Sequence, residues 1–303
     1  AKKMLEILSV GTAVFIKYEF WYYFLKELHK NKVSVYLASG NFRPEQAFFR
    51  WYGKWYRRFL ERFTHIFVQN PESEKLLSAI GLKQVSVAGD TRFDRVYQLR
   101  KTPFSNAVLE AFIRDRAVVV AGSTWDRDEQ LLAHAFRGLS QDIRWIIAPH
   151  ELSEAHVRRL QDRFPGSVRY TELDSGIPPG CRVVLVDTIG MLSYLYRYGT
   201  IAYIGGGFGS GIHNILEAAT YGLPVIFGPA HEKFTEATEL IHLGGAFPVS
   251  GEGELLFTVH QQLENPELLK TTSHIASDYV SKRVGATSVI LDKLCKKSGS
   301  NLL

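Results

Sequence analysis

The sequence is poor in cysteine and contains no long apolar run. Its two cysteines, Cys181 and Cys295, are far apart, so neither a disulfide framework nor the paired spacing of a zinc site is present, which favours a reducing compartment. No stretch reaches about 18 uncharged apolar residues, so no segment of this sequence is predicted to span a bilayer. No repeat of about 20–50 residues is visible, which excludes a solenoid.

What the sequence does contain predicts about two globular domains. Hydrophobic residues make up 46% of the 303 residues, which excludes a disordered chain, and a domain takes roughly 100–200 residues. The net charge of +5 is unevenly spread, because residues 43–62 hold six basic and only two acidic residues. The same segment is rich in Phe, Trp and Tyr. We refer to it as the basic aromatic segment.

Short β-branched runs alternate with helical stretches along the whole chain. This alternation predicts an α/β fold of parallel βαβ units, in two doubly wound domains over residues 1–98 and 99–303. A broken basic helix is expected over residues 45–62, and a helical tail from Pro266 that ends in a basic, polar stub. A ligand is expected at the carboxyl ends of the strands, in the crevice between the domains. Strands are expected over residues 13–16, 33–38, 65–69, 85–87, 117–121, 143–148, 182–186, 200–204 and 224–227.

The strongest local feature is a glycine-rich stretch over residues 205–211, between an expected strand and an expected helix. Backbone N–H groups and a helix N-terminus at such a place predict an anion site. The stretch lacks the Gly-Lys-Ser/Thr of a P-loop and the glycine spacing of a dinucleotide fold, which disfavours an ATPase or a dehydrogenase. A purely structural turn is the alternative.

Three polar residues, His213, Asn214 and Glu217, are expected in the first turns of the helix that follows. Asn214 and Glu217 are three positions apart and therefore share a helix face. A carboxylate at that position has the chemistry to accept two ribose hydroxyls. The alternative is a helix-capping pair, because Asn-x-x-Glu resembles a capping box.

Further loops follow other expected strands. Gly122-Ser123-Thr124 precedes a helix that begins near Asp126, so its hydroxyls are expected to cap that helix or to bind a phosphate. Asp126 and Asp128 have the spacing of a metal-binding pair, but acidic residues are ordinary in a first helical turn, and no metal is expected. Pro149-His150 and residues 187–191 follow two more strands. All these loops leave strand carboxyl ends and should converge on one edge.

Residues 206–229 resemble the donor-binding motif of the Kdo transferases, the 3-deoxy-D-manno-octulosonic acid transferases of lipid A and lipopolysaccharide assembly. The resemblance rests on Gly-Gly followed by His213-Asn214-x-x-Glu217 and later Gly222-x-Pro224. Further stretches are similar to that family in its order, and together they cover essentially the whole chain: Glu19-Phe20-Trp21, Gly89-Asp90-Thr91-Arg92-Phe93-Asp94, Gly122-Ser123-Thr124 and Asp187-Thr188-Ile189-Gly190.

The resemblance implies a GT-B fold and an inverting transfer of Kdo from CMP-Kdo to a lipid A precursor, without a metal or another cofactor. By position, Asn214 and Glu217 would bind the ribose. The charged groups of the donor would lie near Gly206, Gly207, Ser123 and Thr124, and the nucleotide would be bordered by Pro149, His150, Ile189, Gly190 and Met191. Glu151 stands where the family usually has an Arg, which departs from its pattern at one donor contact.

The basic aromatic segment acquires a role from the same resemblance. Arg43, Arg57 and Arg58 would bind phosphates of the lipid acceptor, and Arg92, at a basic position of the family, would pair with a carboxylate or phosphate. Trp and Tyr suit a membrane interface, so we expect peripheral attachment to the cytoplasmic face of the bacterial inner membrane. The alternatives are an amphipathic helix with a solvated basic face, and single-stranded nucleic acid, which the donor loops disfavour.

Inversion at a sugar centre requires a general base, and the family's base is a Glu in a Gly-Glu motif of the first domain. The sequence has no counterpart, and Glu19 matches only a supporting position. We therefore expect an incomplete N-terminal domain in an N-terminally truncated chain, with the family's membrane anchor outside it. Such a chain would bind CMP-Kdo weakly and turn over slowly or not at all.

Two other function classes stay open at this point. One is another GT-B enzyme, such as a sugar-nucleotide epimerase or a different lipid-linked glycosyltransferase. The other is a non-catalytic module that binds an anionic lipid or nucleic acid through residues 43–62.

Overall fold

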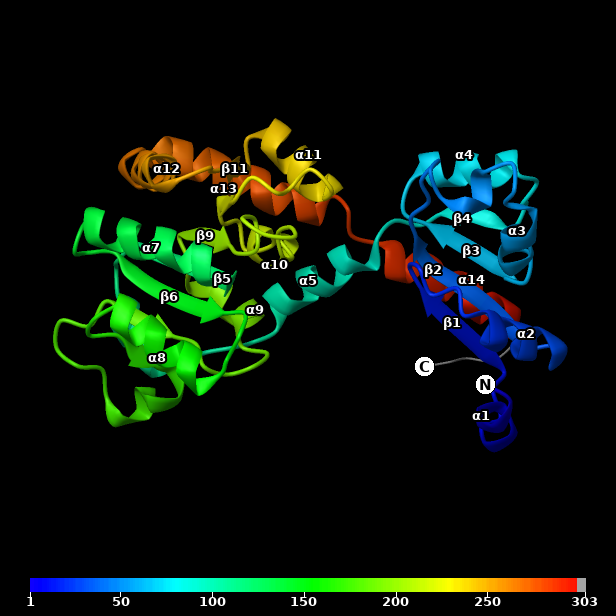
Figure 1. Cartoon of the computed structure of the whole chain (residues 1–303), viewed down its shortest axis with the longest axis horizontal. Helices are drawn as coiled ribbons and strands as arrows, with labels where there is room; N and C mark the ends of the chain where they lie inside the picture. The colour runs from blue at the N-terminus through cyan, green and yellow to red at the C-terminus, as the bar shows by residue number, and fades with distance from the viewer. Residues whose placement is uncertain (299–303) are drawn as a thin grey trace. The chain divides into compact units, whose positions relative to one another are not determined.

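A computed structural model describes residues 1–298 of the chain. Its contacts divide the chain into two compact units, each an α/β structure around a parallel sheet (Figure 1). The first unit combines Ala1–Arg95 with the described residues from Arg283 to Ser298, and the second covers Val96–Lys282. The last residues of the expected basic stub, 299–303, lie outside the described residues.

The first unit is built on a four-stranded sheet in the order β1-β2-β3-β4. Every neighbouring pair is parallel, with Phe15 opposite Leu37 and Ile66 opposite Val85. All four strands were predicted from the alternation pattern. They are β1 (Thr12–Ile16), β2 (Ser34–Gly40), β3 (His65–Val68) and β4 (Val85–Val87). The helices of the first part of the chain are α1 (Lys2–Ile7), α2 (Tyr22–Lys30), α3 (Lys54–Leu60), α4 (Pro71–Ala79) and α5 (Thr91–Lys101).

The two faces of this sheet are covered by different parts of the chain. Leu25, Leu60 and Leu77 of α2, α3 and α4 pack on one face. The other face contacts α14 (Ala286–Ser298), whose Ile290 packs against Tyr36 of β2 (Figure 1). The sequence assigned this tail to the second domain; the structure packs it on the first, because Tyr36, Ala38 and Phe67 present an apolar surface there.

The broken basic helix expected over residues 45–62 is shorter than predicted. It consists of a 3-10 turn, η1 (Ala47–Phe49), and the seven-residue α3, separated at Gly53. Gly53 is required because a Cβ there would lie 2.1 Å from the carbonyl oxygen of Ala47. The close approach of the Ala47 carbonyl thus leaves no room for a side chain at this position.

The second unit contains a seven-stranded parallel sheet in the order β11-β10-β9-β5-β6-β8-β7. Two strands were not predicted, β7 and β11, because runs of two and three residues carry no readable alternation. The strands are β5 (Val118–Thr124), β6 (Arg144–Pro149), β7 (Val168–Arg169), β8 (Val183–Leu185), β9 (Ile201–Ile204), β10 (Val225–Phe227) and β11 (Ala246–Pro248).

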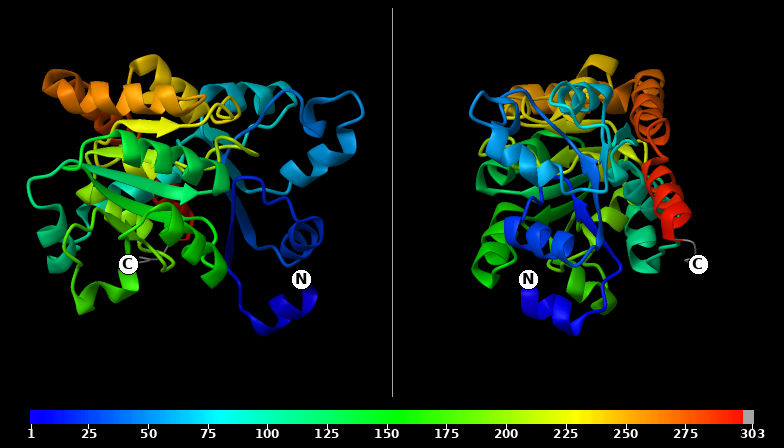
Figure 2. Two further views of the ribbon diagram at one scale, coloured as in Figure 1. Left: turned by 60° about the vertical axis from the view of Figure 1, so that its left-hand side comes forward. Right: turned by 90° about the vertical axis from the view of Figure 1, so that its right-hand side faces the viewer.

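Helices cover both faces of this sheet. Successive residues of β5, Val118 to Ala121, are all buried although they point to opposite faces. The helices α7, α8 and α12 contribute to the core on one face, and Figure 2 gives two further views of the layering. The helices of this part are α6 (Ala107–Ile113), α7 (Asp126–Gly138), α8 (Glu154–Arg163), α9 (Leu192–Leu195), α10 (Leu216–Ala219), α11 (Thr235–Leu243), α12 (Glu252–Glu264) and α13 (Pro266–Ser281), with 3-10 turns η2 (Tyr170–Ser175) and η3 (Tyr196–Tyr198). Within residues 1–298, no helix combines the length and the hydropathy needed to cross a membrane.

Candidate functional site

Four predicted loops lie at the carboxyl edge of the second sheet. They follow β5, β6, β8 and β9, which are neighbours in the order β9-β5-β6-β8. Backbone hydrogen bonds join three of these loops: the amide of His150 donates to the Thr124 carbonyl, and that of Gly205 donates to the Gly122 carbonyl, each at 2.9 Å. The expected convergence of these loops therefore exists at the level of the backbone.

Three aromatic rings form a layered cluster at this edge. Trp125 Nε1 donates to His213 Nε2 at 3.1 Å, and the two rings are nearly parallel, with an angle of 14° between their planes. The His150 ring stacks against both, with centroids 4.4 Å from Trp125 and 4.7 Å from His213. We call these three residues the ring cluster. Their contacts connect the loops that follow β5, β6 and β9.

The hydrogen bond from Trp125 fixes the protonation state of His213. Since Nε2 accepts, the neutral imidazole carries its proton on Nδ1. Burial lowers the pKa of His213, and the neighbouring His150 lowers it further, against the opposing effect of Asp128. A neutral His213 is therefore the form that this arrangement stabilises.

Asn214 and Glu217 do not lie together in a helix, contrary to the sequence prediction. The helix α10 begins only at Leu216 and has a single turn, so His213 and Asn214 precede it. The Asn214 side chain accepts from the Leu216 amide at 3.2 Å and donates to Glu217 Oε1 at 3.1 Å. The N-cap residue of α10 is Ile215, and no side chain caps this helix, so the capping-box alternative for Asn214 and Glu217 is wrong. Both side chains are half-buried, which leaves the Glu217 carboxylate partly open.

Ser123 and Thr124 do not cap the helix α7, which corrects a second expectation. They end β5, and Trp125 is the N-cap residue, its amide donating to Asp128. The Thr124 hydroxyl donates to Glu129 at 3.2 Å. Ser123 has a φ of 53°, so the backbone leaves the strand through a conformation that non-glycine residues rarely adopt.

Two buried acids of α7 anchor these loops from below. Asp128 accepts from the Tyr203 hydroxyl at 2.7 Å and from the Gly206 amide at 2.9 Å. Glu129 accepts from His156 at 2.8 Å and from Arg163 at 2.9 Å. Burial raises the pKa of Glu129, against these hydrogen-bonded partners. Within residues 1–298 no group of three potential metal ligands occurs.

The glycines of the stretch 205–211 are needed for close packing. A Cβ at Gly205 would lie 2.2 Å from the Ser123 carbonyl oxygen, and one at Gly207 would lie 2.5 Å from the Gly228 nitrogen. The amide of Gly206 is used by Asp128. The expectation of a free backbone N–H group is therefore wrong for Gly206. The other glycines of the stretch still lie at the carboxyl edge of the sheet.

The loop after β8 has an exposed tip. Ile189 is 91% exposed, and Gly190 has a φ of 86°. The base of the loop is fixed by Asp187, which accepts from the Thr171 hydroxyl at 2.6 Å and from its amide at 3.1 Å. Met191, the N-cap residue of α9, ends the loop. Because its base is fixed and its tip is exposed, this loop could line one side of a ligand site.

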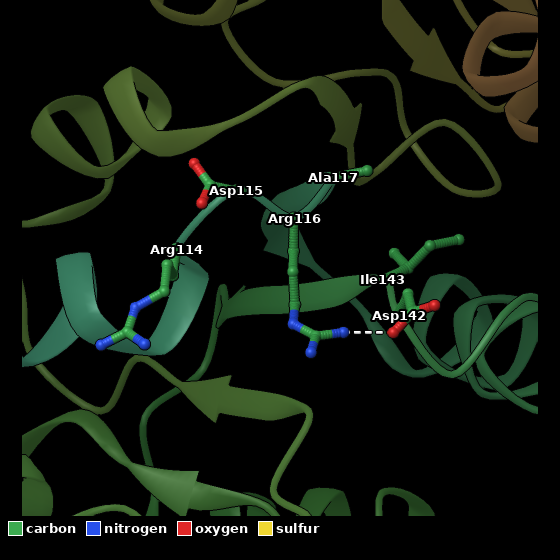
Figure 3. Close-up of a pocket in the computed structure, with 6 residues that line it drawn as sticks. All are labelled: Arg114, Asp115, Arg116, Ala117, Asp142 and Ile143. Atoms are coloured by element: carbon green, nitrogen blue, oxygen red, sulfur yellow. Dashed lines mark hydrogen bonds and ion pairs between the residues drawn. The ribbon is translucent and has the colours of Figure 1, made fainter.

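A hollow of about 410 Å³ lies at the opposite, amino-terminal edge of the same sheet. Figure 3 shows its lining residues, which precede β5 and β6, with Arg116 paired to Asp142. Ligands of doubly wound folds bind at the carboxyl ends of the strands. The volume of this hollow is therefore no reason to place the ligand site there.

The carboxyl edge of the first sheet carries its own polar cluster, centred on the buried Asp90. Asp90 accepts from Arg92 Nε at 2.7 Å and from Gln69 Nε2 at 3.0 Å, and Lys17 Nζ lies 4.0 Å away. Arg92 is thus held by a carboxylate of the protein itself. Ser39, fully buried with a φ of 54°, accepts from the Thr91 amide at 3.1 Å.

Beside this cluster lies a hollow of about 550 Å³, lined by Tyr18, Arg43, Glu45 and Gln46. Arg43 and Tyr18 are exposed there. Glu19, the residue predicted for a supporting role, is exposed in the turn between β1 and α2. The hollow brings together a cation, a carboxylate, an amide and an aromatic ring.

The basic aromatic segment divides into core and surface. Phe42, Phe48, Phe59 and Phe63 are buried in the first unit's core, as the amphipathic alternative predicted. Four rings remain open to solvent, which we call the aromatic surface: Trp51, Tyr52, Trp55 and Tyr56, with Trp51 92% exposed.

The arginines of this segment have separate roles. Arg57 donates to the Phe48 carbonyl at 2.9 Å and to the Arg50 carbonyl at 3.4 Å. Its guanidinium therefore holds the turn before α3, and its assignment to phosphate binding stays a prediction. Arg58 is exposed on α3, beside the aromatic surface.

The sequence interpretation missed Trp125, the central residue of the ring cluster. A signal was present, since Trp125 directly follows a predicted strand and a Ser-Thr pair. Its contact with His213 joins residues 88 positions apart, which no local pattern reveals.

Residues 1–95 match the model of the family described as 3-deoxy-D-manno-octulosonic-acid transferase (kdotransferase). A 3-deoxy-D-manno-octulosonic acid transferase of Aquifex aeolicus is 28% identical over 216 residues, covering 69% of this chain and 57% of that protein. The chain spans about three-fifths of the length of such curated relatives.

Solved structures show the same fold. The C-terminal CMP-Kdo binding domain of WaaA from Acinetobacter baumannii superposes with a TM-score of 0.51 at 22% identity, covering 62% of this chain and 97% of that one. A UDP-GlcNAc 2-epimerase from Neisseria meningitidis gives a TM-score of 0.66 at 18% identity, over 97% of this chain and 78% of that one. The two Rossmann-like units thus form a GT-B-like fold, and the chain is similar in sequence to Kdo transferases.

Proposed function

We propose that the chain takes part in an inverting glycosyl transfer that moves Kdo from CMP-Kdo to a lipid A precursor in lipopolysaccharide biosynthesis. The observation that carries the proposal is that the four loops lie at the carboxyl edge of the second sheet, in a chain whose residues 1–95 match the model of this family. Relatives named as Kdo transferases support the chemistry.

The donor would bind at this edge. Glu217, fixed by Asn214, would accept the ribose hydroxyls. His150 and the loop from Ile189 to Met191 would border the nucleotide, and Ser123 would lie near its charged groups. The Nδ1–H of His213 and backbone amides at this edge are donors that suit an anionic nucleotide without a metal or another cofactor.

The acceptor would bind on the first unit. The hollow lined by Tyr18, Arg43 and Glu45 offers a cation for a phosphate and polar groups for sugar hydroxyls. The aromatic surface and Arg58 would face the lipid, at the cytoplasmic side of the inner membrane. Exposed Trp and Tyr rings beside basic residues are typical of a membrane interface.

A nucleotide panel tests the donor assignment. A bound ligand raises the melting temperature by mass action, so CMP should stabilise the protein more than UDP or GDP. Glu217→Ala should abolish the CMP effect, whereas Arg58→Ala should leave it unchanged. Preferential stabilisation by UDP would instead favour an enzyme of the sugar-nucleotide epimerase type, and no stabilisation by any nucleotide would refute donor binding at this edge.

A further inference from the structure

A hollow of about 290 Å³ opens beside the ring cluster, at the start of α7. Its lining includes two aromatic rings, Trp125 and Phe208, and two polar side chains, Arg127 and Ser210. Its volume is at the lower end of ligand pockets. It therefore suits one small group rather than a whole nucleotide.

The aromatic walls are held in place by the surrounding structure. Trp125 is fixed by its hydrogen bond to His213 and by stacking on His150. Phe208 packs so closely on Gly228 that a Cβ there would meet its ring at 2.9 Å. Two flat apolar surfaces that keep their position suit the apolar face of a sugar ring.

The exposed charged side chain of this hollow is Arg127. Asp128 also lines it, but this acid is buried and both its oxygens accept from groups of the protein. Arg127 is exposed, and its guanidinium lies 6.0 Å from the Phe208 ring centroid. One of its nitrogens donates to the neutral side-chain amide of Gln130 at 3.4 Å. Its guanidinium keeps donors for an anion.

We propose that Arg127 is a specificity-determining residue that recognises the carboxylate of an acidic sugar in the donor. The sugar ring would lie on Trp125 and Phe208, and Ser210 would bind a hydroxyl. A planar guanidinium pairs with a carboxylate through two parallel hydrogen bonds. The inference rests on the proposed function, since it takes a nucleotide sugar as the ligand of this edge.

Isothermal titration calorimetry with CMP and with CMP-N-acetylneuraminate, a nucleotide of an acidic sugar, tests the inference. Arg127→Ala should weaken binding of the acidic-sugar nucleotide roughly tenfold, the size expected for a lost charge-assisted pair. Binding of CMP should stay unchanged, and Arg127→Lys should restore part of the loss. Arg137→Ala, at the exposed end of the same helix, is the matched control.

The same variants separate this inference from the proposed function. An equal loss for both ligands, or no loss for either, would overturn the role of Arg127 while CMP binding stands. If CMP does not bind but UDP does, the proposed donor fails, and UDP-glucuronate against UDP-glucose makes the same comparison. If no nucleotide or nucleotide sugar binds, both proposals fall.

Discussion

At the scale of single residues, Glu217 is the group on which donor binding depends most directly in our proposal. Its carboxylate is half-buried and held by Asn214 Nδ2 at 3.1 Å. A positioned carboxylate loses little entropy when it accepts ligand hydroxyls, so its contribution to binding should be large.

Replacing Glu217 by Gln should weaken CMP binding about tenfold or more, because hydrogen bonds to a charged group contribute roughly 1.5–3 kcal/mol. Calorimetric titration measures the change. Glu264→Gln, an exposed glutamate that pairs with His260 on α12, is the control and should leave affinity unchanged. Equal affinity in wild type and Glu217→Gln would contradict the ribose assignment.

His213 should make stability depend on pH. Burial lowers the pKa of His213 in the folded protein, so the unfolded chain takes up its proton more readily. The resulting stability is fully present above the unfolded pKa of about 6.5 and is lost as the pH falls from there toward the folded pKa.

Melting temperatures measured at pH 7.5 and 5.5 check this expectation. His213→Gln should reduce the loss of stability between the two pH values, since the titrating group is gone. His242→Gln, an exposed histidine on α11, should leave the loss as in wild type. A wild-type loss that survives His213→Gln in full would assign the effect to other groups.

At the scale of elements, Asp128 joins α7 to two other parts of the second unit. One carboxylate oxygen accepts from the Trp125 and Gly206 amides, and the other accepts from Tyr203 of β9. A single side chain thus positions the helix start, the glycine stretch and the neighbouring strand.

Asp128→Asn should lower the free energy of unfolding by about 2–3 kcal/mol, because an amide nitrogen would face buried donors. Urea denaturation gives the difference. Asp162→Asn, at an exposed position on α8, should change stability by less than about 0.5 kcal/mol. Comparable losses in the two variants would show that Asp128 is not an anchor.

Strands could be predicted far better than the loops between them. The apolar run of β5, Val118 to Ala121, carries its own signal, because a buried parallel strand needs apolar residues on both faces. The start of α7 could not be predicted, because Ser123 and Thr124 continue β5 and Trp125 takes the N-cap position. Asp128 of this first turn is bound by Tyr203, which the local sequence does not bring near.

At the scale of the whole molecule, the first unit presents a surface suited to a membrane. Trp51 is 92% exposed, and Arg58 lies on the adjoining helix. Burial of an aromatic ring and attraction to anionic headgroups act together in such binding.

Vesicle co-sedimentation should show binding to bilayers that contain anionic phospholipid. Arg58→Ala should weaken it several-fold, since a basic residue near such a surface contributes about 1 kcal/mol, and Trp51→Ala should weaken it as well. Lys75→Ala on α4 and Phe257→Ala on α12, both exposed, are the controls. Losses of equal size in the controls would show that the aromatic surface and Arg58 are not the membrane-binding site.

The sequence by itself determined the α/β class, nearly all strands and the order of the loops. It could do so because buried parallel strands and glycine turns are encoded by neighbouring residues. Only the tertiary structure decided that the tail helix packs on the first unit, that Arg57 holds a turn, and that Trp125, His150 and His213 stack together. Such contacts join distant residues, and they depend on which surfaces the fold leaves uncovered.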